Sequence, residues 1–191
     1  MALIAAYAID RDDRIVWTDE GFAELAREHG RPELAQAAVG RPLMDFVTGE
    51  RPRELQRALI ARARAGTPGP IELRYRCDSP AMRRFAVLQI EARPDGTVVF
   101  TTWFEALEQR DYQPLLDYTR RRGEETVKLC AWCNRFDCGG GWREVEEAMQ
   151  AVATADTHPP AVEHGLCEIC ELLLTTRPGA GPTRSGPFGR P

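Results

Sequence analysis

Two Cys-x-x-Cys motifs are the part of the chain whose residue types and spacing could do chemistry. The first consists of Cys130 and Cys133, and the second of Cys167 and Cys170. Two intervening residues allow a tight turn to direct both sulfur atoms to one point, and two such turns complete a tetrahedron. Four sulfur ligands suit zinc or an iron–sulfur cluster, whereas magnesium and calcium prefer oxygen. The spacing therefore predicts a four-cysteine metal site with zinc as its ion and an iron–sulfur cluster as the alternative. Core cysteines without a ligand, or a disulfide pair, are the remaining interpretation.

Two further residues near the motifs could take part in such a site. His164 precedes the second motif, and we expect it to donate a hydrogen bond to a thiolate or to the backbone, with direct ligation as the alternative. Cys138 precedes three glycines and would be the reactive thiol if the protein sensed oxidants. A loop cysteine without a role is the simpler interpretation of Cys138.

Composition and charge restrict the class of protein. The net charge of −4 provides no general attraction to nucleic acid or to an anionic membrane. Residues 142–175 are acidic on balance, with Arg143 as their only Lys or Arg. No apolar run approaches the roughly 20 residues of a membrane-spanning helix, and the first residues do not resemble a signal peptide. We therefore expect a cytoplasmic location, where thiols stay reduced and clustered cysteines favour metal binding.

The first hundred residues read as strands and helices joined by short turns. The pattern predicts a strand over 3–9, a return strand over 14–17, and a helix that Thr18 or Asp19 caps and Gly30 ends. A further helix is expected over 52–65. Alternating apolar residues then predict strands over 71–77, 83–92 and 97–104, which should form an antiparallel meander beside the first pair.

Residues 1–104 resemble a PAS domain. The resemblance rests on the opening "AIDRDDRIVWTDEGFAELAREHG", on "VGRPLMDFV" with Val39, Gly40, Leu43 and Asp45, and on the three closing strands. It implies an α+β fold in which helices pack on one face of a five-stranded antiparallel sheet, around a small cavity. We expect this cavity to be lined from the inner face of the sheet and from the helix at 53–65. The candidate lining residues are Leu55, Leu59, Tyr75 and Leu88.

No cofactor can be assigned to this cavity from the residues. The helix at 52–65 contains no histidine that could hold haem, and the flavin-photoreceptor pattern Asn-Cys-Arg-Phe-Leu is absent. His29 is expected to cap the end of an earlier helix. Cys77 is expected to be a small core residue.

The rest of the chain divides into three parts. Residues 105–128 resemble the helical linker that leaves a PAS sheet and pairs two subunits, so we expect either a homodimer through the PAS part and this linker or a bridge between two lobes of a monomer. Residues 129–175 are expected to form a small helical metal-binding module, with a helix that begins at Trp142, a loop over 154–160, and a final short helix after His164. Residues 176–191 are rich in Gly, Pro, Arg and Ser and are expected to be disordered.

The cysteine segment also resembles a known module. The stretch "LCAWCNR…W…EHGLCEIC" is similar to a cysteine-knuckle module of bacterial signalling proteins that contain PAS domains. The matching positions are Cys130, Trp132, Cys133, Trp142, His164, Gly165, Cys167 and Cys170. Glu168 stands where the module often has proline, which leaves the ligands unaffected. The resemblance implies a signalling context.

Three functions follow from these features. The first is a non-catalytic sensor or adaptor, in which a PAS domain is coupled to a zinc site that presents a surface to a protein partner. The second is a redox sensor whose cysteines hold an iron–sulfur cluster or release zinc on oxidation. The third, a nucleic-acid-binding zinc ribbon, is disfavoured by the acidic surroundings of the motifs. Catalysis is not expected, because a four-sulfur site leaves no open position for a substrate.

Overall fold

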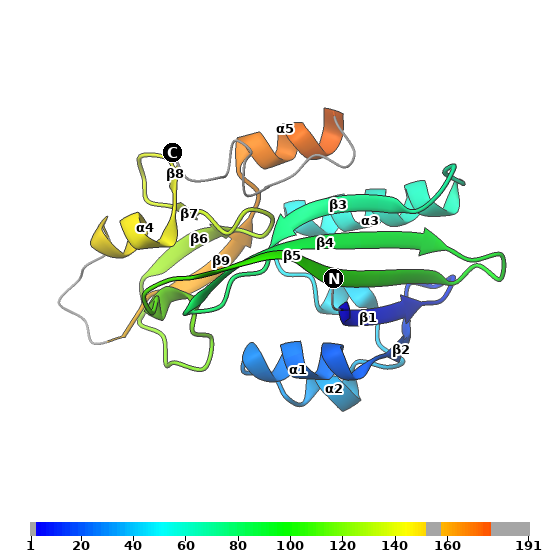
Figure 1. The fold of residues 1–191 in the computed structure, drawn as a ribbon, viewed down its shortest axis with the longest axis horizontal. Coiled ribbons are helices and arrows are strands. Elements are labelled where there is room, and N and C mark those ends of the chain that lie inside the picture. Colours follow the sequence, from blue (N-terminus) through cyan, green and yellow to red (C-terminus); the bar gives the residue numbers. More distant parts are fainter. Residues whose placement is uncertain (1–2, 152–157, 177–191) are drawn as a thin grey trace.

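The computed structural model of the protein describes residues 3–151 and 158–176. A five-stranded antiparallel sheet forms the first part of the chain. Its neighbouring strands follow the order β2-β1-β5-β4-β3, so that β2 and β3 are the two edges (Figure 1). The expectation of an α+β chain with such a sheet is confirmed. The strands are β1 (Leu3–Ile9), β2 (Ile15–Thr18), β3 (Ile71–Arg76), β4 (Met82–Ala92) and β5 (Val98–Gln109).

Local patterns explain most of this sheet. In β3 the side chains of Ile71 and Leu73 are buried and that of Glu72 is exposed, as a half-buried strand requires. The turn between β4 and β5 places Gly96 at a φ of +92°, which glycine adopts without strain. The Asp95 carboxylate accepts a hydrogen bond from the Thr97 amide and closes the turn.

The helices pack beside the sheet. Figure 1 shows α3 behind the strands, on the face where its residues contact β4 and β5. The Asp19 carboxylate caps the first helix by accepting a hydrogen bond from the Phe22 amide at 2.8 Å. The ring Nδ1 of His29 lies 2.8 Å from the Leu25 carbonyl at the other end, which confirms the expected capping role of His29. The helical segments are α1 (Glu20–Glu28), α2 (Leu34–Ala37), the 3-10 helix η1 (Leu43–Asp45) and α3 (Glu50–Arg64).

A second, four-stranded sheet carries the cysteine motifs. Its strand order is β8-β7-β6-β9, and the edge strand β9 pairs with β6 in parallel. The elements of this part are β6 (Thr126–Cys130), β7 (Phe136–Asp137), β8 (Trp142–Arg143), α4 (Val145–Ala151), β9 (Ala161–Gly165) and α5 (Glu168–Thr176). The expectation of a small helical module is therefore wrong, because a four-stranded sheet accompanies α4 and α5. Trp142 lies in a strand, the helix begins at Val145, and His164 lies in β9.

The helical linker expected over 105–128 is also wrong. The first residues of this segment extend β5 and pair with the beginning of β4 as far as Gln109. A single 3-10 turn follows, η2 (Pro114–Leu116), and β6 begins at Thr126. The physical reason is that exposed and half-buried residues alternate from Glu105 to Gln109, which is the period of a strand. Pro114 then restricts the backbone and, lacking an N–H, cannot donate within a helix.

One hydrophobic core joins the two sheets. It contains Phe100 from the first sheet and Leu59 from α3, together with Trp132 and all four cysteines of the motifs. A second cluster packs Leu115 of η2 against Leu129 and Phe136 of the second sheet. In the described part of the chain, no helix has the length and apolar character to cross a membrane. The tail expected over 176–191 lies, beyond Thr176, outside the described residues.

Candidate metal centre

The first cysteine motif is a tight turn at the end of β6. The amide of Asn134 donates to the Cys130 carbonyl at 3.0 Å, and the Cys130 amide donates to the Arg135 carbonyl at 2.8 Å. Asn134 has a φ of +57°, a conformation that asparagine tolerates better than most residues. These bonds close the turn so that both cysteine side chains lie on its inner side.

The second motif is brought to the first by the parallel pairing of β6 and β9. In this register Cys130 lies beside Gly165, and the Ala131 amide donates to the Gly165 carbonyl at 2.9 Å. Cys167 then follows by two residues, and Cys170 lies in the first turn of α5. Two turns distant in sequence are thereby placed face to face.

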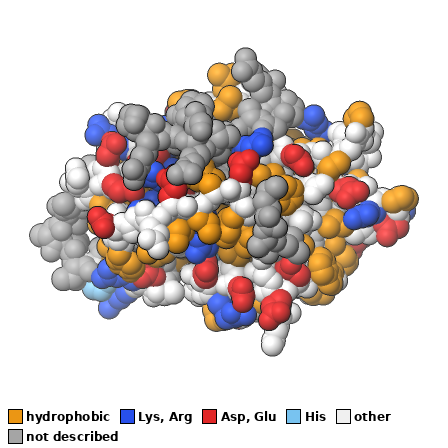
Figure 2. Space-filling view, in the orientation of Figure 1, with side chains coloured by type: hydrophobic (Ala, Val, Ile, Leu, Met, Phe, Trp, Pro, Cys, Tyr) orange, Lys and Arg blue, Asp and Glu red, His pale blue; other side chains and the backbone are white. Residues whose placement is uncertain are grey.

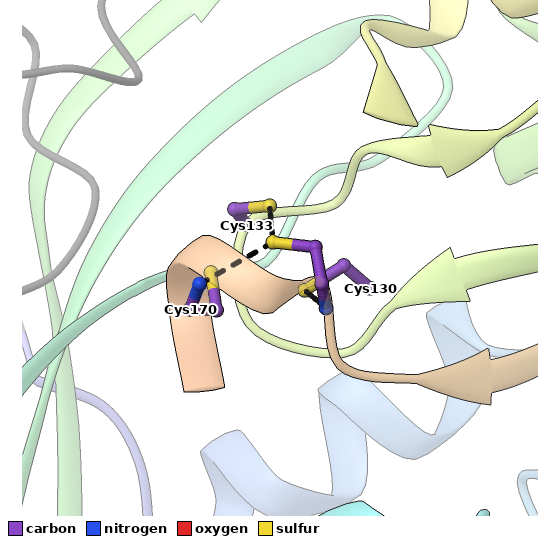
Figure 3. Close-up of side chains that lie close together, drawn as sticks. Cys130, Cys133 and Cys170 are labelled. Atoms are coloured by element: carbon purple, nitrogen blue, oxygen red, sulfur yellow. Dashed lines mark hydrogen bonds between the residues drawn. The ribbon is translucent and has the colours of Figure 1, made fainter. Parts of the chain in front are cut away.

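The four cysteine sulfurs form one compact group. All four Sγ atoms lie within 4.8 Å of one another, and those of Cys133 and Cys167 are 3.8 Å apart. A zinc ion with bonds of about 2.3 Å to four sulfurs has sulfur–sulfur edges of about 3.8 Å, so the spacing fits one tetrahedral ion. Figure 3 shows the side chains of Cys130, Cys133 and Cys170 gathered from the first turn and from α5. The predicted ligand set is thus brought together, and it can hold a metal ion.

The site is closed to solvent. The four cysteines are between 0% and 2% exposed. The Cys167 amide donates a hydrogen bond to the Cys130 sulfur, and the Cys170 amide donates one to the Cys167 sulfur, each at 3.4 Å. Backbone donors of this kind support thiolate charge at a buried site.

The electrostatics of the group require a cation for full ionisation. Hydrogen bonds from the Cys133, Cys167 and Cys170 thiols lower the pKa of Cys130 well below its usual range. The same hydrogen bonds raise the pKa values of Cys133 and Cys170, because each thiol keeps its proton and donates a hydrogen bond to a neighbouring sulfur. Four thiolates can coexist in this space only around a positive charge.

The structure does not bring His164 or Cys138 into the group of four sulfurs. The ring of His164 stacks on that of Tyr118 at 6.5 Å between centroids, and burial, with the nearby His29 charge, lowers the pKa of His164. The Sγ of Cys138 contacts the Phe136 carbonyl at 3.8 Å, and burial raises the pKa of this thiol. Cys138 therefore lacks the lowered pKa of a reactive cysteine.

The four residues expected to line a PAS cavity all belong to the apolar core. Leu59 is buried, and Leu55, Tyr75 and Leu88 are partly buried against it. Leu55 also lines a groove of about 200 Å³ between α3 and α5. A larger hollow of about 300 Å³ lies elsewhere, bordered by His29, Arg84, Tyr112 and Tyr118. A ligand in the space between sheet and helices stays a prediction. The remaining thiol, Cys77, is half-buried and belongs to neither core cluster, so its expected place in the core is not confirmed. Desolvation nevertheless raises its pKa to about 11, which makes it an unreactive thiol.

A buried ion-pair network supports the first turn, and the sequence did not indicate it. The Arg76 guanidinium pairs with Asp78 and, at 2.7 Å, with Glu144, and the side chains of Arg76 and Asp78 are fully buried. Arg110 pairs with Asp78 at 2.9 Å, and Arg135 pairs with Glu144 at 3.1 Å. Glu144 lies between β8 and α4, so the network joins the cysteine part to the end of β3. Its only sequence signal is a run of charges that reads equally well as a solvated surface.

No protein-family model matches the chain, and the search of curated proteins gives no match.

Proposed function

We propose that the protein is a non-catalytic sensor or adaptor, in which a PAS-like sheet domain is joined to a four-cysteine zinc centre that presents a surface to a protein partner. The observation that carries the proposal is the group of four buried sulfurs within 4.8 Å of one another. Cys130, Cys133, Cys167 and Cys170 would hold the ion. Zinc bound in this way supplies folding energy, and it leaves no coordination position for a substrate.

The spacing of the sulfurs favours one ion over a cluster. In an iron–sulfur cluster several irons and sulfides separate the cysteine ligands, which therefore lie farther apart than around a single ion. The burial of all four cysteines also disfavours zinc release by oxidants, because thiol oxidation follows exposure. Peroxide treatment tests this alternative. We expect the metal to stay bound at peroxide concentrations that oxidise Cys138, and prompt release would favour the redox sensor.

The surface supports a protein partner over nucleic acid. On the face shown in Figure 2, acidic and basic side chains of the described residues are interspersed. Next to the metal centre, α5 exposes half of the Ile169 side chain. An apolar side chain on a helix that the metal anchors is suited to contact with another protein.

Co-purification with quantitative mass spectrometry tests the adaptor function. The tagged protein, Cys170→Ser and Cys138→Ser would be compared in the cells that make the protein. We expect a partner protein that is enriched with the unchanged chain and with Cys138→Ser but not with Cys170→Ser. Equal enrichment of every protein with all three chains would contradict a partner surface that depends on the metal.

A further inference from the structure

Trp132, between the two cysteines of the first motif, covers the edge of the five-stranded sheet. β3 is the last strand of that sheet, so its outward-facing backbone groups have no neighbouring strand in the sheet. The carbonyl of Trp132 accepts a hydrogen bond from the Arg76 amide at 2.8 Å. Its indole Nε1 donates to the Arg74 carbonyl at 2.7 Å. One residue of the metal-binding turn therefore satisfies two backbone groups of the edge.

These two bonds imitate strand pairing. In a parallel ladder, one residue donates to a carbonyl of the neighbouring strand and accepts from the amide two positions further on. Trp132 does the same with Arg74 and Arg76, except that its indole N–H replaces the backbone N–H. Tyr75, between these two residues, lies with its ring 5.8 Å from the indole. Trp132 thus takes the place of one residue of an additional strand.

A third bond extends the contact to the end of β3. The side-chain oxygen of Asn134 accepts from the Asp78 amide at 2.8 Å. Trp132 and Asn134 belong to the turn whose shape the ligands Cys130 and Cys133 determine. The metal would therefore fix the turn, and the turn covers the edge.

We propose that Trp132 is a metal-dependent cover of the β3 edge, and that in the metal-free protein this edge pairs with β3 of a second copy of the chain. The inference rests on the proposed metal site. Without the ion the turn loses its anchor at two of its residues, and the backbone groups of Arg74 and Arg76 become free. An uncovered edge strand pairs readily with another strand.

Charge complementarity identifies the second copy as the occupant. Because Arg76 donates outward, the alternation along a strand directs the backbone groups of Glu72 and Arg74 outward as well. An antiparallel pair of two β3 strands centred on Leu73 places Glu72 of each copy opposite Arg74 of the other. Opposite charges in directly paired positions stabilise a strand pair, and like charges destabilise it.

Light scattering and amide hydrogen exchange with and without a chelator, under reducing conditions, test the proposal. We expect removal of the metal to double the particle mass and to accelerate exchange at the Arg76 and Asp78 amides about tenfold at low protein concentration. The Leu73 and Tyr75 amides, which face β4, should stay protected. Circular dichroism should retain the sheet. The proposal would be overturned if removal of the metal left the particle mass or the exchange rate of the Arg76 amide unchanged, or if it abolished the whole sheet.

A charge exchange isolates the pairing. Arg74→Glu should prevent the doubling, because it places Glu72 opposite a second glutamate, and Glu72→Arg combined with Arg74→Glu should restore it. Trp17→Phe, at an exposed site in β2, is the control and should behave as the unchanged chain. Doubling in Arg74→Glu would overturn the pairing. The metal content of the same samples separates the two proposals: a chain that binds no metal contradicts both, whereas a metal-binding chain that does not double contradicts the edge pairing alone.

Discussion

The Sγ atoms of Cys133 and Cys167 lie 3.8 Å apart, although 34 positions separate the two residues in the chain. The parallel pairing of β6 and β9 produces this proximity, because it places Cys130, the first residue of the first motif, beside Gly165, which precedes the second. The metal centre therefore depends on the second sheet, and a bound metal would in turn hold the ends of β6 and β9 together. Four predictions about the centre and the residues that support it can be measured.

Removal of the metal should destabilise the whole protein, because the four cysteines belong to the core that also contains Phe100 and Leu59. Binding to a structural site contributes to folding, and we expect the melting temperature to fall by at least about 10 °C on chelation. Calorimetry with and without chelator measures the change. Cys138→Ser should show the same decrease as the unchanged chain. A melting temperature that chelation leaves unchanged would contradict the structural role.

Replacement of Arg76 should lower the free energy of unfolding substantially. Arg76→Met leaves Asp78 and Glu144 with fewer partners in a buried setting, and we expect a loss of about 3 kcal/mol in the free energy of unfolding. Arg93→Met is the matched control, since Arg93 pairs with Glu91 at 3.3 Å on the surface and should contribute less than about 1 kcal/mol. Urea denaturation of the metal-loaded proteins compares them. Equal losses would show that the buried network has no special role.

Glu144 should make the free energy of unfolding depend on pH in the acid range. Burial alone would raise its pKa, but the Arg76 charge and hydrogen bonds from Arg76 and Arg135, with Arg83 nearby, lower the pKa below the ordinary value of 4.5. A lowered pKa stabilises the folded state above the ordinary value, and this stabilisation is lost as the pH falls through the folded value. The stability difference between the unchanged chain and Glu144→Gln should therefore shrink below about pH 4.5.

Urea titrations of both proteins from pH 6 to pH 3 measure that difference. Protonation of the thiolates releases metal from both proteins alike, so the comparison removes this effect. A difference that stays constant over the range would exclude Glu144 as the titrating group.

Gly49 joins α3 to the cysteine part. It has a φ of +89°, and a Cβ at this position would lie 2.2 Å from the His164 carbonyl oxygen in β9. Gly66 has nearly the same φ, +88°, but open space around it. Gly66→Ala should cost about 1–2 kcal/mol for its backbone conformation alone, and Gly49→Ala should cost clearly more. Equal losses in urea denaturation would place β9 farther from α3 than the structure does.

Local signals were sufficient for the ligand set and for the first sheet. The Cys-x-x-Cys spacing identifies its four ligands without knowledge of the fold, and alternation and turn residues mark β1 to β5. Residues such as Asp19 and Gly96 act through contacts with near neighbours in the chain, which is why their roles can be predicted from the sequence.

The missed features depend on contacts between distant residues. Nothing within β9 indicates that it pairs with β6, so the sequence alone does not place His164 in a strand. Arg76 alternates with apolar residues in β3, a pattern that predicts an exposed side chain. It is instead 1% exposed, and its charge is paired with Asp78 and Glu144. The two bonds of Trp132 to β3 likewise join residues that no local pattern relates.

The most direct test of the metal centre is elemental analysis together with an absorption spectrum, on protein purified without oxygen. The four-sulfur geometry predicts one zinc ion per chain, no visible absorbance, and loss of the zinc in Cys133→Ser and Cys170→Ser. Iron with broad visible absorbance would contradict zinc, and more than one iron per chain together with inorganic sulfide would replace the single-ion site by a cluster. Protein that contains no metal would contradict the metal centre itself.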